Sequence, residues 1–261
     1  MRYAATLLAF MLARSAAVPV PGDAVASDSP VKGSRQFVLV VTETDSTPRA
    51  RLTSYERSGG NWVRAFSCPA VVGKNGMGWG RGLHSDRDRN HAEPVKREGD
   101  GKAPMGAFKL LRAYGYPPRN SVRTRFPYRQ TTPDLACIDD ARSEHYAMIV
   151  NADREFAPGA SLPTHEDMFR PDDLYRYVIL IGHNTTRPVP GAGSCIFLHV
   201  WRGEDSSTAG CTAIAEEHMV RLLEWLDPAK KPVIVQLTWR SWERLRGRWG
   251  LPGDWERKSG R

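Results

Sequence analysis

The strongest constraint on the fold is a series of short apolar runs, rich in β-branched and aromatic residues and separated by Gly, Pro, Asn or Asp. Runs of about four to eight such residues are typical of β-strands. We predict strands at residues 36–42, 61–66, 106–111, 146–150, 177–181, 195–201 and 232–237. The chain is therefore expected to be mainly β, with long loops rich in Gly and Pro, of which residues 73–104 are the clearest.

One helix is predicted, over residues 216–226. Its apolar positions recur at helical spacing and are Met219, Leu222, Leu223 and Leu226. Two glutamates lie in its first turn, where carboxylates complement the helix dipole, and Pro228 ends it. The fold class is therefore α+β, dominated by strands.

The chain divides into four parts. Residues 1–26 read as a signal peptide, because Arg2 precedes an apolar stretch at 4–13 and small residues follow at cleavage-compatible spacing. Residues 27–35 form a linker. The chain has 261 residues, of which 41% are hydrophobic, and residues 36–238 are long enough for one sizeable core. Residues 239–261 form a basic tail rich in Trp and Arg, which either packs its Trp on the core or binds an acidic polymer.

The net charge and the expected signal peptide together restrict the kinds of partner that the protein can bind. The formal net charge is +8. A basic protein can bind nucleic acid, anionic lipid or an anionic polymer, and a signal peptide favours a wall polymer in the periplasm or cell wall over nucleic acid. No apolar stretch beyond the N-terminus is long enough to span a bilayer.

The cysteines leave several pairings open. They are Cys68, Cys137, Cys195 and Cys211. An oxidising compartment permits disulfides, but a nucleophile must stay free, which leaves room for one bridge. Their spacing forms no zinc clamp, the histidines are scattered without an HExxH motif, and no metal or cofactor is expected.

Residues 193–214 hold the strongest candidate for chemistry. Cys211 follows a glycine and precedes the expected helix, whose dipole would lower the thiol pKa. Backbone amides around Gly210 and Thr212 can stabilise an oxyanion, and His199 can serve as the base. Against this, Cys211 can instead be a structural cysteine bonded to Cys195.

Supporting roles are assigned by position alone. Ser194 is a candidate for orienting His199, and Arg202 for binding a substrate carboxylate. His183 is a rival base, since it follows an expected strand. Asp139 is either a site residue or a turn carboxylate.

This stretch resembles the signature of the YkuD-type L,D-transpeptidases, a His followed by a loop and Ser/Thr-x-Gly-Cys. The matching residues are His199, Thr208, Gly210 and Cys211. Residues 101–108 (GKAPMGAF) resemble the family's x-P-x-G-x-F motif. Further resemblance to a subgroup with the TAGC form of the motif is carried by VVGKNGMGWG (71–80), CIDD (137–140), GSCIFLH (193–199) and PVIVQL (232–237).

The resemblance covers residues 36–238 and implies a YkuD-like β-sandwich. It also implies a thioester at Cys211 with a peptidoglycan stem peptide, formed at the L-centre carbonyl of diaminopimelate and resolved by an amine. Carbapenems would be covalent inhibitors, and no cofactor is implied. The commoner motif has His at 209 and Arg or Asn at 213, where this chain has alanine.

Three other functions stay open. Resolution of the thioester by water would make the enzyme an L,D-carboxypeptidase or amidase. A non-catalytic peptidoglycan-binding protein would keep the scaffold and use the basic tail. A metallopeptidase is disfavoured because the HExxH motif is missing.

Overall fold

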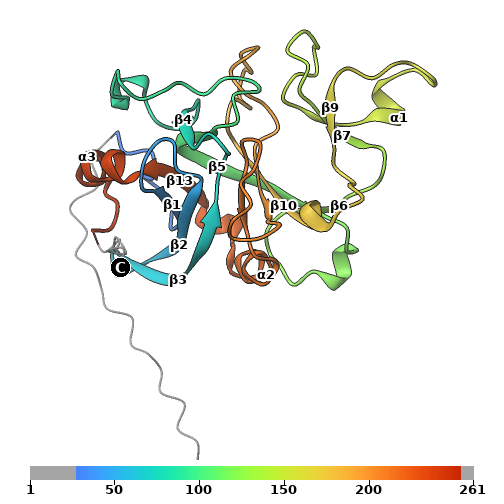
Figure 1. The fold of residues 1–261 in the computed structure, drawn as a ribbon. Helices are drawn as coiled ribbons and strands as arrows, with labels where there is room; N and C mark the ends of the chain where they lie inside the picture. The colour runs from blue at the N-terminus through green and yellow to red at the C-terminus, as the bar shows by residue number, and fades with distance from the viewer. Residues whose placement is uncertain (1–27, 254–261) are drawn as a thin grey trace, which may run out of the picture.

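The computed structural model describes residues 28–253 and is mainly β, as expected (Figure 1). Its larger sheet closes on itself, because β10 pairs with both β11 and β5. The expected sandwich therefore takes the form of a closed barrel. In order around the ring, the strands are β10 (Tyr177–Ile181), β11 (Phe197–Val200), β12 (Thr212–Ile214), β3 (Asn61–Val71), β2 (Arg49–Ser58), β1 (Gln36–Thr42), β13 (Val233–Thr238) and β5 (Ala103–Gly115).

Strand β1 is enclosed along its whole length. Every residue of β1 is buried, since the strand pairs with β2 on one side and with β13 on the other. A strand covered on both faces tolerates an unbroken apolar run, which is why its bounds are predictable from sequence. Two short strands, β4 (Met77–Trp79) and β6 (Tyr128–Gln130), extend the sheet from β5.

Two helices pack against the barrel. Helix α2 (Glu216–Trp225) confirms the predicted helix and buries Met219, Leu222 and Leu223. Helix α3 (Trp239–Trp249) lies in the segment expected to be a tail, and Trp242 and Trp249 join the main core. None of the helices in the described part of the chain is long and apolar enough to cross a bilayer.

A separate three-stranded sheet lies beside the barrel, at the upper right of Figure 1. It contains β7 (Leu135–Ile138), β8 (Ile149–Asn151) and β9 (His165–Asp167), followed in the chain after β8 by the short helix α1 (Ala152–Glu155). A second apolar cluster joins this small sheet to the barrel. Its buried members are Tyr114, Leu135, Cys137, Met168, Tyr175, Val178, Cys195, Phe197 and Cys211.

Several sequence expectations differ from the structure. Strand β2 was not predicted because its residues are mostly polar. The hairpin turn at Gly59 and Gly60, and not an apolar alternation, places it beside β3. The strand expected at 146–150 begins only at Ile149, since Tyr146 lies in a turn. Within the stretch expected to be a linker, Val31 is fully buried in the core. The expected signal peptide, and the tail beyond residue 253, lie outside the described residues.

Candidate active site

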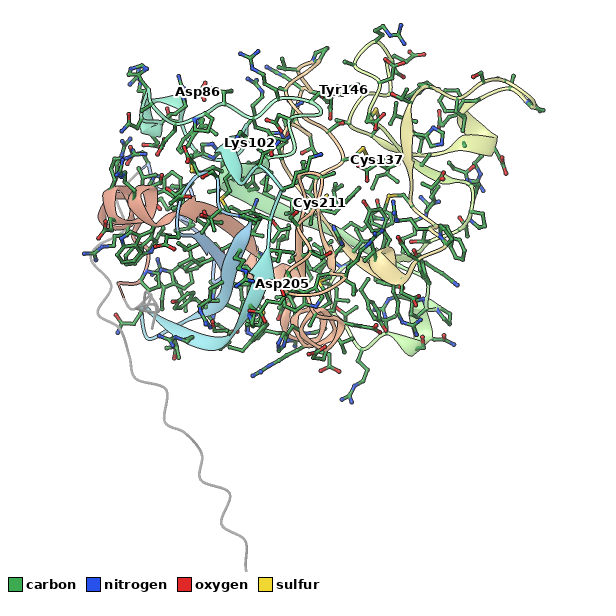
Figure 2. All side chains as sticks on the ribbon, in the orientation of Figure 1. Asp86, Lys102, Cys137, Tyr146, Asp205 and Cys211 are labelled. Atoms are coloured by element: carbon green, nitrogen blue, oxygen red, sulfur yellow. A yellow bond between two sulfur atoms is a disulfide. The ribbon has the colours of Figure 1, made fainter. Side chains whose placement is uncertain are left out.

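Cys211, labelled in Figure 2, is one of the residues that line a cavity of about 520 Å³ between the barrel and the small sheet. It directly precedes β12, which runs parallel to β11. The Phe197 amide donates a hydrogen bond to Cys211 Sγ at 3.3 Å, and Sγ lies 3.6 Å from the Cys195 carbonyl oxygen. The side chain is buried, and only 7% of the residue is exposed.

The expectation that the helix dipole activates Cys211 is wrong. Strand β12 separates the cysteine from α2, which begins only at Glu216. Burial instead raises the thiol pKa, the nearby Glu166 carboxylate raises it further, and the Phe197 amide only partly opposes them. A buried thiol in an apolar cluster is neutral at rest because a thiolate there would be poorly solvated.

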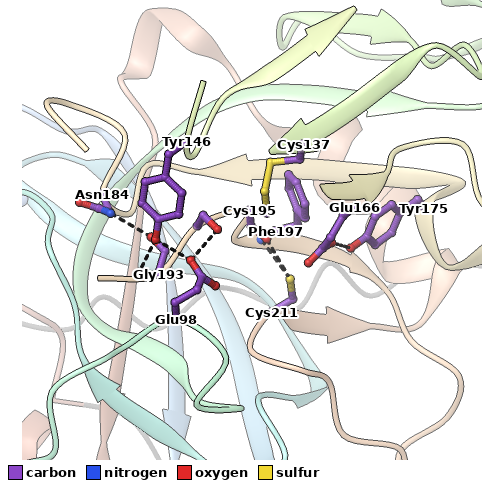
Figure 3. Close-up of a disulfide and its surroundings, with 11 residues drawn as sticks. Glu98, Cys137, Tyr146, Glu166, Tyr175, Asn184, Gly193, Cys195, Phe197 and Cys211 are labelled. Atoms are coloured by element: carbon purple, nitrogen blue, oxygen red, sulfur yellow. Dashed lines mark hydrogen bonds between the residues drawn. A yellow bond between two sulfur atoms is a disulfide. The ribbon is translucent and has the colours of Figure 1, made fainter. Parts of the chain in front are cut away.

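The disulfide in this region settles which cysteines stay free. Cys137 of β7 is bonded to Cys195, which precedes β11 (Figure 3). Cys68 and Cys211 are free and buried. The alternative in which Cys211 is bonded to Cys195 is therefore wrong, and the bridge instead attaches the small sheet to the barrel beside the free thiol.

His199 lines the same cavity from β11, two residues beyond Phe197. Its Nδ1 lies 2.7 Å from the Val200 carbonyl oxygen, which can only accept, so Nδ1 carries the proton in the neutral ring. In that tautomer Nε2 is the unprotonated nitrogen, and a backbone hydrogen bond with Leu174 also acts on the ring. Burial lowers the pKa of His199 to about 4, so the ring is neutral near pH 7.

The loop before Cys211 is held by its own side chains. The Thr208 hydroxyl donates to the Cys211 carbonyl oxygen at 2.6 Å and accepts from the Gly210 amide at 3.1 Å. The Gly210 amide is thus already engaged and is not a free oxyanion donor, contrary to expectation. At Gly210, where φ is +154°, a Cβ would lie 3.1 Å from the Lys102 carbonyl oxygen, so the position favours glycine.

Thr212 connects the cysteine loop to the 101–108 motif. Its hydroxyl donates to the side-chain oxygen of Gln236 in β13, and the Gln236 amide nitrogen donates to the Pro104 carbonyl oxygen at 2.8 Å. Thr212 and Gln236 are fully buried. Buried polar groups of this kind must be paired, which explains why polar residues interrupt otherwise apolar strands. The role of Gln236 could not be read from its sequence position alone.

The remaining expected residues divide into two groups. Asp139 and Arg202 line the cavity, but Arg202 already binds the Asp172 carboxylate at 3.0 Å. Ser194 also lines it, yet its hydroxyl donates to Glu98 at 2.7 Å and not to His199. His183 lies outside the cavity lining, so it is not placed as a rival base.

His183 has a structural role instead. Its Nδ1 accepts from the Arg81 amide at 3.2 Å, and its Nε2 donates to the Ala192 carbonyl oxygen at 3.0 Å. With both ring nitrogens bonded to backbone and 2% of the residue exposed, the imidazole holds two loops together. Burial lowers its pKa to about 3.

These two histidines predict acid sensitivity of the fold. Their folded pKa values, about 4 and about 3, lie below the ordinary value of 6.5. Between pH 6.5 and 4 the unfolded state therefore binds more protons, and stability should fall as pH is lowered, by about 1.4 kcal/mol per pH unit for each histidine. Urea unfolding of wild type and His183→Gln at pH 7 and pH 4.5 tests this. The variant should lose less stability than wild type, and equal losses would contradict the prediction.

Sequence reasoning missed several cavity-lining residues. They are Lys96, Glu98, Glu166, Arg170 and Tyr175. No local motif marks them, because the small sheet and the loops bring them together from distant parts of the chain. Within residues 28–253, no group of three or more His, Cys, Asp or Glu side chains is arranged to hold a metal ion.

Comparison with known proteins identifies one family. The family model described as the L,D-transpeptidase catalytic domain (YkuD) matches residues 38–235. No curated protein matches the chain. A solved structure of Bd1075 from Bdellovibrio bacteriovorus is similar, with 14% identity and a TM-score of 0.38. The similarity covers 84% of this chain and 53% of that one, so the chain spans about half the length of Bd1075.

Proposed function

The chain belongs to the YkuD family of L,D-transpeptidase catalytic domains, and from this premise we propose that it is an exported cysteine acyltransferase of the cell wall. The family is cysteine-dependent and acts on peptidoglycan peptides. The observation that carries the assignment is the reduced Cys211 in one cavity with His199, while the Cys137–Cys195 bridge occupies the other cysteines of that cluster. Such a bridge also supports export to an oxidising compartment.

In this proposal Cys211 is the nucleophile and His199 is the base. As the substrate carbonyl approaches, the thiol proton passes to Nε2 and Sγ attacks the L-centre carbonyl of diaminopimelate in a tetrapeptide stem. Proton transfer coupled to attack suits a resting pair in which both groups are neutral, as the raised pKa of the thiol and the lowered pKa of the imidazole indicate. The terminal D-amino acid leaves with the proton from His199, and a thioester remains on Cys211.

The oxyanion of the tetrahedral intermediate needs backbone donors. Because the Gly210 amide bonds to Thr208 and Thr212 is paired with Leu198 in the parallel β11–β12 ladder, we assign this role to the amide of Cys211. The Thr208 hydroxyl and the Thr212–Gln236–Pro104 connection hold that segment in place. No cofactor enters any of these steps.

The acyl acceptor decides between two activities of the same site. An amine gives a cross-linked dimer or another amide, whereas water gives an L,D-carboxypeptidase. Mass-spectrometric analysis of products from the enzyme and purified disaccharide-tetrapeptide distinguishes them. Dimers with released D-alanine are the expected result, trimmed tripeptide stems alone would indicate the hydrolase, and no released D-alanine would refute the acyltransferase.

A carbapenem is expected to acylate Cys211. Its strained β-lactam carbonyl is open to the same thiol attack and leaves a thioester of the whole molecule on Sγ. Intact-mass spectrometry of the native enzyme should show one adduct, which is missing from Cys211→Ala and retained in Cys68→Ala. An adduct that persists in Cys211→Ala would place the nucleophile elsewhere.

A further inference from the structure

Glu166 carries a half-buried carboxyl group that lines the Cys211 cavity and that the steps above do not use. It lies on β9 opposite Cys137 of β7, and the disulfide of Cys137 holds this part of the small sheet beside Cys195. The Tyr175 hydroxyl donates to Glu166 Oε2 at 2.6 Å (Figure 3). Tyr175 also packs edge-on against the His199 ring, with 5.3 Å between ring centroids. Tyr175 thus contacts both Glu166 and the proposed base His199.

Some of the charged side chains that line the cavity are paired with an opposite charge and others are not. The wall's cations already have carboxylate partners, since Lys96 binds Asp100 at 2.7 Å and Arg170 binds Asp172 in a two-pronged contact. Among residues 28–253, no cation forms a salt bridge with Glu166, whose one carboxylate bond is to a neutral phenol. The charge of Arg170 lowers the pKa of Glu166, but its guanidinium forms its ion pair with Asp172, so no cation is paired with the Glu166 carboxylate in the described residues.

A second carboxylate, that of Asp139, lines the same cavity. Oδ1 of Asp139 is buried and has no hydrogen-bond partner in the described part of the chain. Glu98 differs, because hydroxyls of Tyr146 and Ser194 both donate to it. Burial raises the pKa of Glu166, and the charge of Asp139 adds to this. A half-buried carboxyl group with a shifted pKa, in a cavity that also holds a nucleophile, is a candidate functional group.

We propose that Glu166 receives the ammonium group of the acyl acceptor and takes its proton as the amine attacks the Cys211 thioester. This inference rests on the proposed acyltransferase function and names an amine, not water, as the acceptor that the site is built to bind. An alkylammonium ion has a pKa near 10 and is not a nucleophile until it loses a proton. The Glu166 carboxylate both attracts this ion and accepts that proton.

The step balances. One proton passes from the ammonium to the Glu166 carboxylate, giving a free amine and a neutral carboxyl group. The amine nitrogen then forms a bond to the thioester carbonyl carbon, the C–S bond breaks, and its electron pair goes to Cys211 Sγ. The second nitrogen proton passes through His199 to the sulfur and restores the thiol. Glu166 returns its proton to solvent before the next turnover.

Glu166→Gln tests the proposal, because it keeps the shape of the side chain and removes its negative charge. With disaccharide-tetrapeptide as donor and acceptor, D-alanine release reports thioester formation, and the ratio of dimer to tripeptide reports how the thioester is resolved. In Glu166→Gln we expect that ratio to fall about tenfold or more, the effect of one lost charge-assisted hydrogen bond. The burst of D-alanine released in the first turnover should not fall, since the Glu166 charge raises the pKa of Cys211 and its removal favours attack.

Two further variants make the result specific. Asp167→Asn removes a carboxylate from the next position of β9, whose side chain is 69% exposed and pairs with His165, and it should leave the product ratio unchanged. Glu166→Asp keeps the charge on a shorter side chain and should retain part of the dimer yield, with a raised KM for the acceptor. It also replaces Glu166→Gln as the test if that variant does not fold.

The possible outcomes distinguish the role of Glu166 from the proposed acyltransferase function. An unchanged product ratio in Glu166→Gln, with dimers formed, overturns the role of Glu166 and leaves the acyltransferase function standing. Release of D-alanine by wild type without dimers at any acceptor concentration also overturns it, and shows that water is the acceptor. No D-alanine release by wild type overturns the proposed function itself, and the inference with it.

Discussion

Cys211→Ala is expected to lower D-alanine release from disaccharide-tetrapeptide by about four orders of magnitude or more. In covalent catalysis, no neighbouring group replaces a missing nucleophile, and the effect of its loss is of that size in comparable enzymes. The fold should survive, since alanine removes one buried atom and costs on the order of 1 kcal/mol. Release of D-alanine from purified muropeptide, measured by mass spectrometry, is the readout.

Cys68→Ala is the matched control for that experiment. Cys68 is the other free cysteine in the described part of the chain, and it is as buried as Cys211. It lies in β3 within the main core, and burial raises its pKa to about 12. This variant should keep its activity at a similar small cost in stability. Loss of activity in Cys68→Ala, or its retention in Cys211→Ala, would contradict the assignment.

Removal of the Cys137–Cys195 bridge is expected to have the largest effect on stability. The bridge closes a loop with a sequence separation of 58, and its loss frees the unfolded chain. Chain entropy for a loop of that length corresponds to about 4 kcal/mol. The double variant Cys137→Ala/Cys195→Ala should therefore unfold at a clearly lower urea concentration, with the difference seen as a shift of the midpoint.

The same variant should lose activity before it unfolds. The bridge holds the small sheet, and Glu166 with it, beside the Cys195–Phe197 backbone that contacts Cys211 Sγ. Without the bridge this wall of the cavity can move away, so D-alanine release should fall under conditions in which circular dichroism still shows folded protein. Replacing both cysteines keeps Cys211 from pairing with a freed partner. An unchanged urea midpoint would show that packing alone holds the small sheet in place.

Much of the fold can be predicted from the sequence because buried strands and helices have a recognisable spacing of apolar residues. Strands β1 and β10 begin and end at the expected residues, since strands covered by neighbours are apolar without interruption. Helix α2 follows its apolar spacing in the same way. Strand β2 could not be predicted, because its partners and not its composition determine it. The same holds for β9, three residues that pair only with β7.

The sequence by itself determined the family, the identity of Cys211 and His199 as the candidate pair, and the order of the main strands. These depend on residues close together in the chain, where spacing and composition carry the signal. Only the tertiary structure decided which cysteines pair, that burial raises the pKa of the thiol where a helix dipole was expected to lower it, and that Glu166 and Tyr175 share its cavity. Solvation and charge at Cys211 depend on atoms that are distant in sequence and adjacent in space, and no local pattern records them.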